Sequence, residues 1–234
     1  MDTVLKRHHT AIWWIVLVLV WLPAAVLAYS YVTQRLGTNG LETLERTSGR
    51  WAVIWLIATL SITPARWGLT LTARLFACSW GKRLPDWNVL MRMRRMIGLS
   101  CFGYAVLHVL IYLEFDLGYD WALLTEEIAE KPYLLAGAAN FALLSLLTVT
   151  STNGMMRRLK RNWRRIHRLV YACAFLAIAH WWWMSKPGDL RALPYCIALI
   201  LLLAWRVPHW LGWLKLPGDN GMEAPERTTR GAKQ

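Results

Sequence analysis

Three histidines lie within apolar stretches of the chain, where an imidazole finds few polar partners. His108 lies in the stretch 96–113, and His167 and His180 lie 13 residues apart in the stretch 163–184. A polar ring in hydrocarbon is costly unless it is hydrogen-bonded or coordinates a metal, so a histidine in a membrane segment indicates a functional site. Two helices that each bring one histidine to the same depth can hold a haem iron between the two rings.

The composition predicts a polytopic membrane protein. Of 234 residues, 56% are hydrophobic, whereas soluble domains are about 45–50% apolar. The excess is gathered into long stretches, which leaves no room for a large domain outside the membrane. We therefore expect an all-α fold, a helical bundle with six transmembrane helices and both termini in the cytoplasm.

Six stretches are candidates for crossing about 30 Å of hydrocarbon, which takes about 20 helical residues. They are residues 11–31, 50–63, 95–113, 133–150, 163–184 and 192–210. The second is short on its own, so its helix is either longer than the apolar part or tilted. We assign 1–10 to a cytoplasmic N-terminus, 11–215 to one six-helix domain, and 216–234 to a disordered cytoplasmic tail.

The charges between these stretches alternate in sign. Segments 64–95 and 151–168 carry net charges of +6 and +7, whereas segment 114–131 carries −5. Cytoplasmic loops of membrane proteins are rich in Lys and Arg, so the two basic segments and both termini are expected inside. The same rule explains the overall charge of +13, so nucleic-acid binding is not expected.

The cysteine spacing and the lack of a phosphate-binding loop exclude several kinds of site. The four cysteines form no CxxC pair, so we expect neither a disulfide framework nor a zinc site. They are interpreted as small buried hydrophobic residues: Cys78, Cys101, Cys173 and Cys196.

Segment 11–31 is longer and richer in Trp than a signal peptide, which favours a retained helix. No Gly-rich phosphate loop is present, so any electrons must come from another protein or a diffusible donor.

Helix direction predicts that two of the histidines share a depth. His108 lies 13 residues beyond Arg95 and His180 lies 15 beyond Arg165, which corresponds to about 20 and 22 Å from the basic side. Both rings are therefore expected in the outer half of the membrane, on helices that run in parallel. Because no CxxCH attachment motif is present, the pair predicts a bis-histidine site for haem b. The second nitrogen of each ring should be fixed by a hydrogen bond.

His167 is expected one turn from the cytoplasmic edge. Its spacing from His180 turns it about 140° around an ideal helix, and the residue opposite it on the third span is close to Arg94, which does not ligate iron. Three interpretations stay open: a second haem with another ligand, a flavin or quinone held by basic residues, or a hydrogen bond at an Arg-rich helix end. His8, His9 and His209 are expected in solvent or at the interface.

Several short motifs, taken in order and spacing, resemble the MsrQ (YedZ) family over residues from about 10 to 210. They are Ile62-Thr-Pro-Ala-Arg66, Arg94-Arg-Met-Ile-Gly-Leu99, Leu107-His108, Lys131-Pro-Tyr133, Leu147-Thr-Val-Thr-Ser-Thr152, and Trp163-Arg-Arg-Ile-His-Arg-Leu-Val-Tyr171 followed by His180. That family is the haem-binding membrane subunit of the periplasmic methionine sulfoxide reductase system of bacteria. It is related to the transmembrane domain of ferric reductases and NADPH oxidases.

The resemblance implies a multi-pass protein of the bacterial inner membrane with one or two b-type haems, FMN, and a periplasmic molybdopterin enzyme as its partner. It implies electrons drawn from the quinone pool or from a cytosolic flavin reductase. The family's haem histidines fall on His108, His167 and His180. Arg94 stands where the oxidases have a fourth histidine, so two bis-histidine haems do not follow from the resemblance.

The resulting hypothesis is an electron carrier rather than a catalytic sulfoxide reductase. Electrons would enter near His167, reach the haem at His108 and His180, and leave to a partner that repairs oxidised methionine in periplasmic proteins. The acidic segment 114–131 would steer a basic docking patch. The alternatives are a transmembrane ferric or cupric reductase, and a non-redox transporter or scaffold that uses buried histidines for protons.

Overall fold

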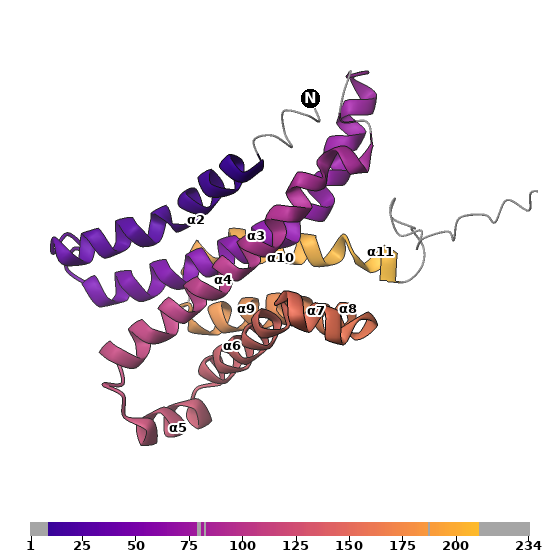
Figure 1. Ribbon diagram of the computed structural model, residues 1–234. Helices are drawn as coiled ribbons and strands as arrows, with labels where there is room; N and C mark the ends of the chain where they lie inside the picture. The colour runs from indigo at the N-terminus through magenta and orange to yellow at the C-terminus, as the bar shows by residue number, and fades with distance from the viewer. Residues whose placement is uncertain (1–8, 79–80, 82, 187, 211–234) are drawn as a thin grey trace, which may run out of the picture.

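The computed structural model describes residues 9–78, 81, 83–186 and 188–210, and the regular structure in this part of the chain is entirely helical (Figure 1). The predicted N-terminal segment and C-terminal tail lie almost wholly outside the described residues, as does His8. The side chains of His9 and His209 also lie outside them, so the expectations for these three histidines stay predictions.

Four helices are long. They are α2 (His9–Val32), α3 (Gly40–Leu75), α4 (Asn88–Phe115) and α6 (Pro132–Thr150). The shorter elements are η1 (Leu84–Trp87), α5 (Trp121–Glu130), α7 (Asn153–Leu159), α8 (Arg161–His167), α9 (Val170–Met184), η2 (Leu190–Ala192), α10 (Leu193–Ala204) and α11 (Val207–Trp210).

The long helices have the length and composition of membrane spans. Of the described helices, α2, α3, α4 and α6 are each long and apolar enough to cross a bilayer. Large apolar side chains cover their outer surfaces, and those of α9 and α10 as well, such as Trp14, Phe175 and Leu201, which are 57–65% exposed. Such a surface suits lipid rather than water, so the chain is a multi-pass membrane protein. Helices α9 and α10 have only 15 and 12 residues, and their crossing stays a prediction.

The predicted bounds agree with the structure for some spans and differ for others. The first and fourth spans match α2 and α6 to within two residues. The second, predicted as 50–63, is too short, because polar residues on either side continue the same helix and make α3 36 residues long. Segments 114–131 and 151–168 also contain helices, α5 in the first and α7 and α8 in the second.

The prediction of one helix over 163–184 is wrong. Helix α8 ends at His167 and α9 begins at Val170, because the backbone N–H groups of Arg168, Leu169 and Tyr171 bond to the third residue back instead of the fourth. Such a tightened turn interrupts an α-helix. His167 and His180 therefore lie on different helices. The sixth predicted span is likewise divided after Ala204, before Pro208, a residue that cannot donate a helical hydrogen bond.

The helices form one bundle around a shared core. Helix α3 packs along α4, α6 packs along α9, and α10 contacts both α3 and α9 (Figure 1). The main core cluster joins four helices through Leu56, Leu60, Cys101, Ala174, Ala177 and Leu199. Three of the four cysteines, those in the apolar stretches, are buried as predicted, whereas Cys78 is exposed.

Two prolines lie inside long helices, and in both places a side chain from another helix bonds to the interrupted backbone. Near Pro23 in α2, the hydroxyl of Tyr104 accepts a hydrogen bond from the Ala24 N–H (3.1 Å) and donates to the Val20 carbonyl (2.8 Å). The hydroxyl thus stands between two groups that would otherwise bond to each other along the helix. Tyr104 is completely buried, so α4 holds α2 next to Pro23.

The second proline, Pro64, leaves the Leu60 carbonyl in α3 without its usual donor, because proline has no N–H. The guanidinium of Arg206 donates to this carbonyl over 3.2 Å, and its other terminal nitrogen donates to the Tyr171 hydroxyl over 2.6 Å. Arg206 is only 8% exposed. The turn between α10 and α11 is thereby fixed to α3 by a buried polar contact.

Candidate functional site

The structure brings His108 of α4 and His180 of α9 together. Their ring centroids lie 6.2 Å apart and the ring planes are inclined by 79°. The pairing agrees with the depth expected from the positions of Arg95 and Arg165. The two helices reach this point from different parts of the chain, with α3 next to α4 and α6 next to α9.

The ring of His108 is oriented by the backbone of α3. Its Nδ1 lies 3.1 Å from the Glu45 carbonyl oxygen, and 3.4 Å from the hydroxyl of the fully buried Ser48. A carbonyl only accepts hydrogen bonds, so Nδ1 carries the proton and donates it. Gly49 makes room for the ring, since a Cβ at this position would lie 3.2 Å from both Nδ1 and Cε1.

The ring of His180 is oriented in the same way by the first turn of α6. Its Nδ1 donates to the Tyr133 carbonyl over 2.7 Å. Gly137 lies one turn further along, and a Cβ there would be 2.8 Å from Nδ1 and 2.9 Å from Cε1. Real side chains do not approach this closely, so with any other residue at this position the ring of His180 or helix α6 would have to shift.

Both rings therefore have Nδ1 protonated and Nε2 available as a ligand. In the described part of the chain, Nε2 of neither ring takes part in a hydrogen bond. A metal–imidazole bond is about 2.0 Å long and a ring nitrogen lies about 1.1 Å from its centroid, so one metal ion holds two opposed centroids about 6 Å apart. The observed 6.2 Å fits this arrangement.

The donor set fits haem iron better than a metal ion held by protein alone. Among the described residues, no group of three or more His, Cys, Asp or Glu side chains is placed to bind a metal. Two imidazoles supply only the axial positions of a six-coordinate iron, and the porphyrin supplies the other four ligands. His108 and His180 are therefore the residues that could hold this cofactor.

His167 lies apart from the other two histidines, at the end of α8. Its Nε2 is 3.2 Å from the Ser151 hydroxyl, its Nδ1 is 3.2 Å from the Trp163 carbonyl, and its ring stacks on Trp163 with centroids 4.1 Å apart. Both ring nitrogens are thus engaged within the protein. This geometry agrees with the interpretation of a hydrogen-bonded histidine at an Arg-rich helix end.

Arg94 lies near His167 but makes no ion pair with a described residue. Its charge acts on His167 and on Arg206, and also on the Tyr171 hydroxyl. Three basic side chains therefore share the end of the bundle where α8 and α11 lie. None of the four ion pairs among the described residues involves them.

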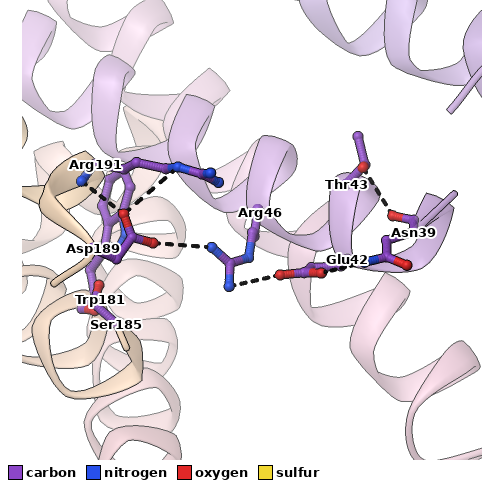
Figure 2. A network of polar contacts seen from close by, with 8 residues as sticks. All are labelled: Asn39, Glu42, Thr43, Arg46, Trp181, Ser185, Asp189 and Arg191. Carbon is purple, nitrogen blue, oxygen red and sulfur yellow. Dashed lines mark hydrogen bonds and ion pairs between the residues drawn. The ribbon is translucent and has the colours of Figure 1, made fainter. Parts of the chain in front are cut away.

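The opposite end of the bundle carries a network of charged side chains (Figure 2). Arg46 of α3 contacts Glu42 at 2.8 Å and Asp189 at 3.4 Å, and Asp189 accepts from the Arg191 N–H over 3.0 Å. This last hydrogen bond, with the charges of Arg191 and Arg46, lowers the pKa of Asp189. The network joins α3, which orients His108, to the loop that follows α9, which carries His180.

The acidic segment also contacts the helices of the histidine pair. Tyr112, one turn beyond His108 on α4, donates to Glu127 of α5 over 2.5 Å, and Lys131 contacts the same carboxylate at 2.6 Å. Lys131 precedes α6, whose Tyr133 carbonyl holds His180. Helix α5 is thus connected to both halves of the site.

The sequence did not reveal the residues that orient the two rings. Glu45 and Tyr133 act through backbone carbonyls, which leave no trace in side-chain type. The glycines gave a weak signal, because Gly137 lies four residues after Tyr133 and Gly49 lies four after Glu45, which places each glycine one helical turn from its carbonyl.

Comparison with known proteins agrees with this architecture. Residues 48–178 match the family described as ferric reductase like transmembrane component, a range that includes His108 and His167 and ends two residues before His180. Three similar proteins are each named haem-binding subunit MsrQ of protein-methionine-sulfoxide reductase. The relative from Herminiimonas arsenicoxydans is 36% identical over 202 residues, covering 86% of this chain and 85% of the relative.

The other two relatives come from Xanthomonas. The protein of Xanthomonas oryzae pv. oryzae (strain MAFF 311018) is 40% identical over 181 residues, covering 77% of this chain and 73% of its own length. That of Xanthomonas campestris pv. campestris (strain 8004) is 41% identical over 172 residues, covering 74% and 72%. With this identity over most of both chains, and with a ferric reductase-like transmembrane component across more than half of its length, the chain belongs to the MsrQ family.

Proposed function

We propose that this chain is the haem-binding membrane subunit of a protein-methionine-sulfoxide reductase. It carries electrons across the bacterial inner membrane to a periplasmic, molybdopterin-containing catalytic subunit. The pair His108 and His180, with ring centroids 6.2 Å apart and no hydrogen bond to either Nε2 in the described part of the chain, carries this proposal. Membership of the MsrQ family, whose named relatives are haem-binding subunits, supports it.

His108 and His180 would hold one haem b through Nε2. When bound, haem supplies a one-electron redox couple suited to electron transfer. The Glu45 and Tyr133 carbonyls keep each ring in the tautomer that a metal requires, and keep both rings in place before the cofactor binds. Such preorganisation favours binding because little side-chain freedom is lost.

The proposal assigns FMN to the basic end of the bundle. Arg94, next to His167, brings a positive charge there without an ion pair to any described residue, and the Arg-rich helices α7 and α8 lie at the same end. A flavin phosphate is a dianion that arginine binds through charge-assisted hydrogen bonds. Because both nitrogens of His167 are engaged, a single haem is proposed rather than two.

The proposed orientation follows the charges. The Arg-rich helices α7 and α8 face the cytoplasm, where quinone or a cytosolic flavin reductase delivers electrons. Helix α5 faces the periplasm, and its acidic side chains Glu126, Glu127 and Glu130 are available to a basic partner surface. Six crossings and two cytoplasmic termini complete this topology.

Absorption spectroscopy of the purified protein tests the haem site. The wild type should show a reduced b-type α-band, and pyridine haemochrome analysis should give one haem per chain. His108→Ala and His180→Ala should each abolish the band, because either change removes an axial ligand. His167→Ala should retain it. An unchanged spectrum in both of the first two variants would refute the proposed ligand pair.

The match to a ferric reductase-like component supports a second candidate, a reductase of external metal ions. The two functions differ in what the reduced chain does alone. A ferric chelate that is reduced by the isolated, prereduced chain would favour the metal reductase. Reoxidation only when the periplasmic subunit and methionine sulfoxide are added would favour the proposed function.

A further inference from the structure

A cavity of about 540 Å³ opens between α2 and α4, away from the paired histidines. Trp13 and Leu17 of α2 form one wall, and Met96 and Leu99 of α4 form the other. The residues of α4 that line the cavity extend from Arg92 to Ser100, about two helical turns or roughly 12 Å, with the two arginines at one end and Met96, Leu99 and Ser100 towards the other. The cavity therefore has the chemistry and size to accept a hydrocarbon chain from the side of the bundle.

The inner wall of this cavity is fixed by tight packing. Trp21 lines the cavity and stacks on the buried Tyr104 with ring centroids 5.2 Å apart and an interplanar angle of 18°. Gly103 permits this position, since a Cβ there would lie 2.6 Å from the indole. The hydroxyl of Tyr104 is itself bound to the backbone of α2 near Pro23. The cavity is thus part of the fold and does not depend on a freely rotating side chain.

The other end of the cavity is positively charged. Arg92 and Arg95 line it, and no acidic residue does. Arg95 donates to the side-chain oxygen of Asn153 over 2.6 Å, which orients its guanidinium. Arg92 is exposed and has no hydrogen bond or ion pair with any residue that the structure describes.

We propose that this groove binds an anionic phospholipid, with its phosphate on Arg92 and Arg95 and one acyl chain between α2 and α4. Basic pockets between transmembrane helices are suited to anionic headgroups. A neutral quinone would leave the two cations without a counter-charge, and a free phosphate would leave the apolar walls unused. The lipid would hold α2 against α4 along the part of α2 that precedes Pro23.

Lipid titration of the purified full-length protein, followed by native mass spectrometry and thermal unfolding, tests this site. Phosphatidylglycerol should bind and stabilise the protein at about 25-fold lower concentration than phosphatidylcholine. The double variant Arg92→Gln and Arg95→Gln should lose this preference, because each cation near a headgroup contributes roughly fivefold to binding. Leu99→Trp should weaken the binding of both lipids, because it fills the space of the acyl chain.

A matched control removes the same charge elsewhere. Arg157→Gln with Arg158→Gln changes two exposed arginines of α7 that do not line the cavity, and the lipid preference should remain. The α-band of the haem should be the same in both double variants, so this test is independent of the proposed function. Equal binding of both lipids, displacement of phosphatidylglycerol by an equimolar quinone, or an equal thermal shift with glycerol phosphate alone would overturn the proposal.

Discussion

At the scale of single residues, a glycine sets how close α6 lies to the ring of His180. The Cβ introduced by Gly137→Ala would meet Nδ1 at 2.8 Å, so the ring must move away from the Tyr133 carbonyl. We expect this variant to lose most of its bound haem, because the ring loses both its tautomer and its position. The measurement is the ratio of haem to protein after purification.

Two other glycines supply the comparison. Gly49→Ala should have a smaller effect, since its Cβ would lie 3.2 Å from the ring of His108. Gly68→Ala should have none, because Gly68 lies in α3 with no atom within 4 Å of its missing Cβ. If Gly137→Ala bound as much haem as Gly68→Ala, the close packing of α6 on His180 would be irrelevant to the cofactor.

The residues of the site differ in how far the sequence could predict them. His108 and His180 could be paired because their depth depends only on the rise of a helix and on the charges that mark its start. The Glu45 and Tyr133 carbonyls could not be found, since any residue type supplies a backbone oxygen. The position of His167 was predicted on the wrong helix, because the tightened turn after it involves ordinary residues with no proline or glycine.

At the scale of helices, the backbone of α3 that Pro64 interrupts has a hydrogen-bond partner in the turn after α10. Arg206→Leu should lower the free energy of unfolding by about 1–3 kcal/mol, because the Leu60 carbonyl is left buried without a donor. In a Pro64→Ala background the cost should be clearly smaller, since the new backbone N–H at position 64 can bond to the same carbonyl.

Unfolding in mixed detergent micelles, followed by circular dichroism, gives the four free energies of this double-mutant cycle. Arg206→Leu removes the contact with Tyr171 in both backgrounds. The difference between its two costs in unfolding free energy, with Pro64 and with Ala at position 64, therefore isolates the hydrogen bond to the Leu60 carbonyl. An equal loss with and without Pro64 would show that Arg206 does not replace the donor that the proline removes.

Helix α5 should be held to α4 by a contact that depends on pH. The hydrogen bonds from Lys131 and Tyr112 lower the pKa of Glu127. Because this pKa is lowered in the folded protein, the contact stabilises the protein at pH values above the ordinary carboxyl pKa. The stabilisation is lost as the pH falls through the lowered pKa. At neutral pH, Glu127→Gln should increase amide hydrogen exchange in 121–130 a few fold, because an exposed ion pair contributes little.

The neighbouring Glu126→Gln is the control, since it removes the same charge from α5 but no hydrogen bond to a described residue. Its exchange should match the wild type at neutral pH. At a pH below the lowered pKa of Glu127, where its carboxyl group is protonated in the folded protein, all three proteins should show the same exchange once it is corrected for the intrinsic rate. A difference between Glu127→Gln and the wild type that persists in acid would contradict this role of the carboxylate.

At the scale of the whole molecule, the ends of the bundle can be assigned from contacts as well as from charge. The ion pair between Arg46 and Asp189 puts the loop after α9 at the same end as the start of α3. The contact between Arg95 and Asn153 puts the start of α7 at the end where α4 begins. The loop after α9 and the basic segment therefore lie at opposite ends, so α9 traverses the bundle although its 15 residues cover only about 22 Å.

Labelling of single cysteines in intact cells tests this topology. In a background without Cys78, Cys101, Cys173 and Cys196, we expect Thr125→Cys in α5 and Lys186→Cys after α9 to react with a membrane-impermeant maleimide from the periplasm. Gly154→Cys in α7 should react only after the inner membrane is disrupted, because the basic segment faces the cytoplasm. The decisive position is Lys186. Its protection in intact cells, with Thr125→Cys labelled, would mean that α9 and α10 do not cross and that the membrane domain has only the four long spans.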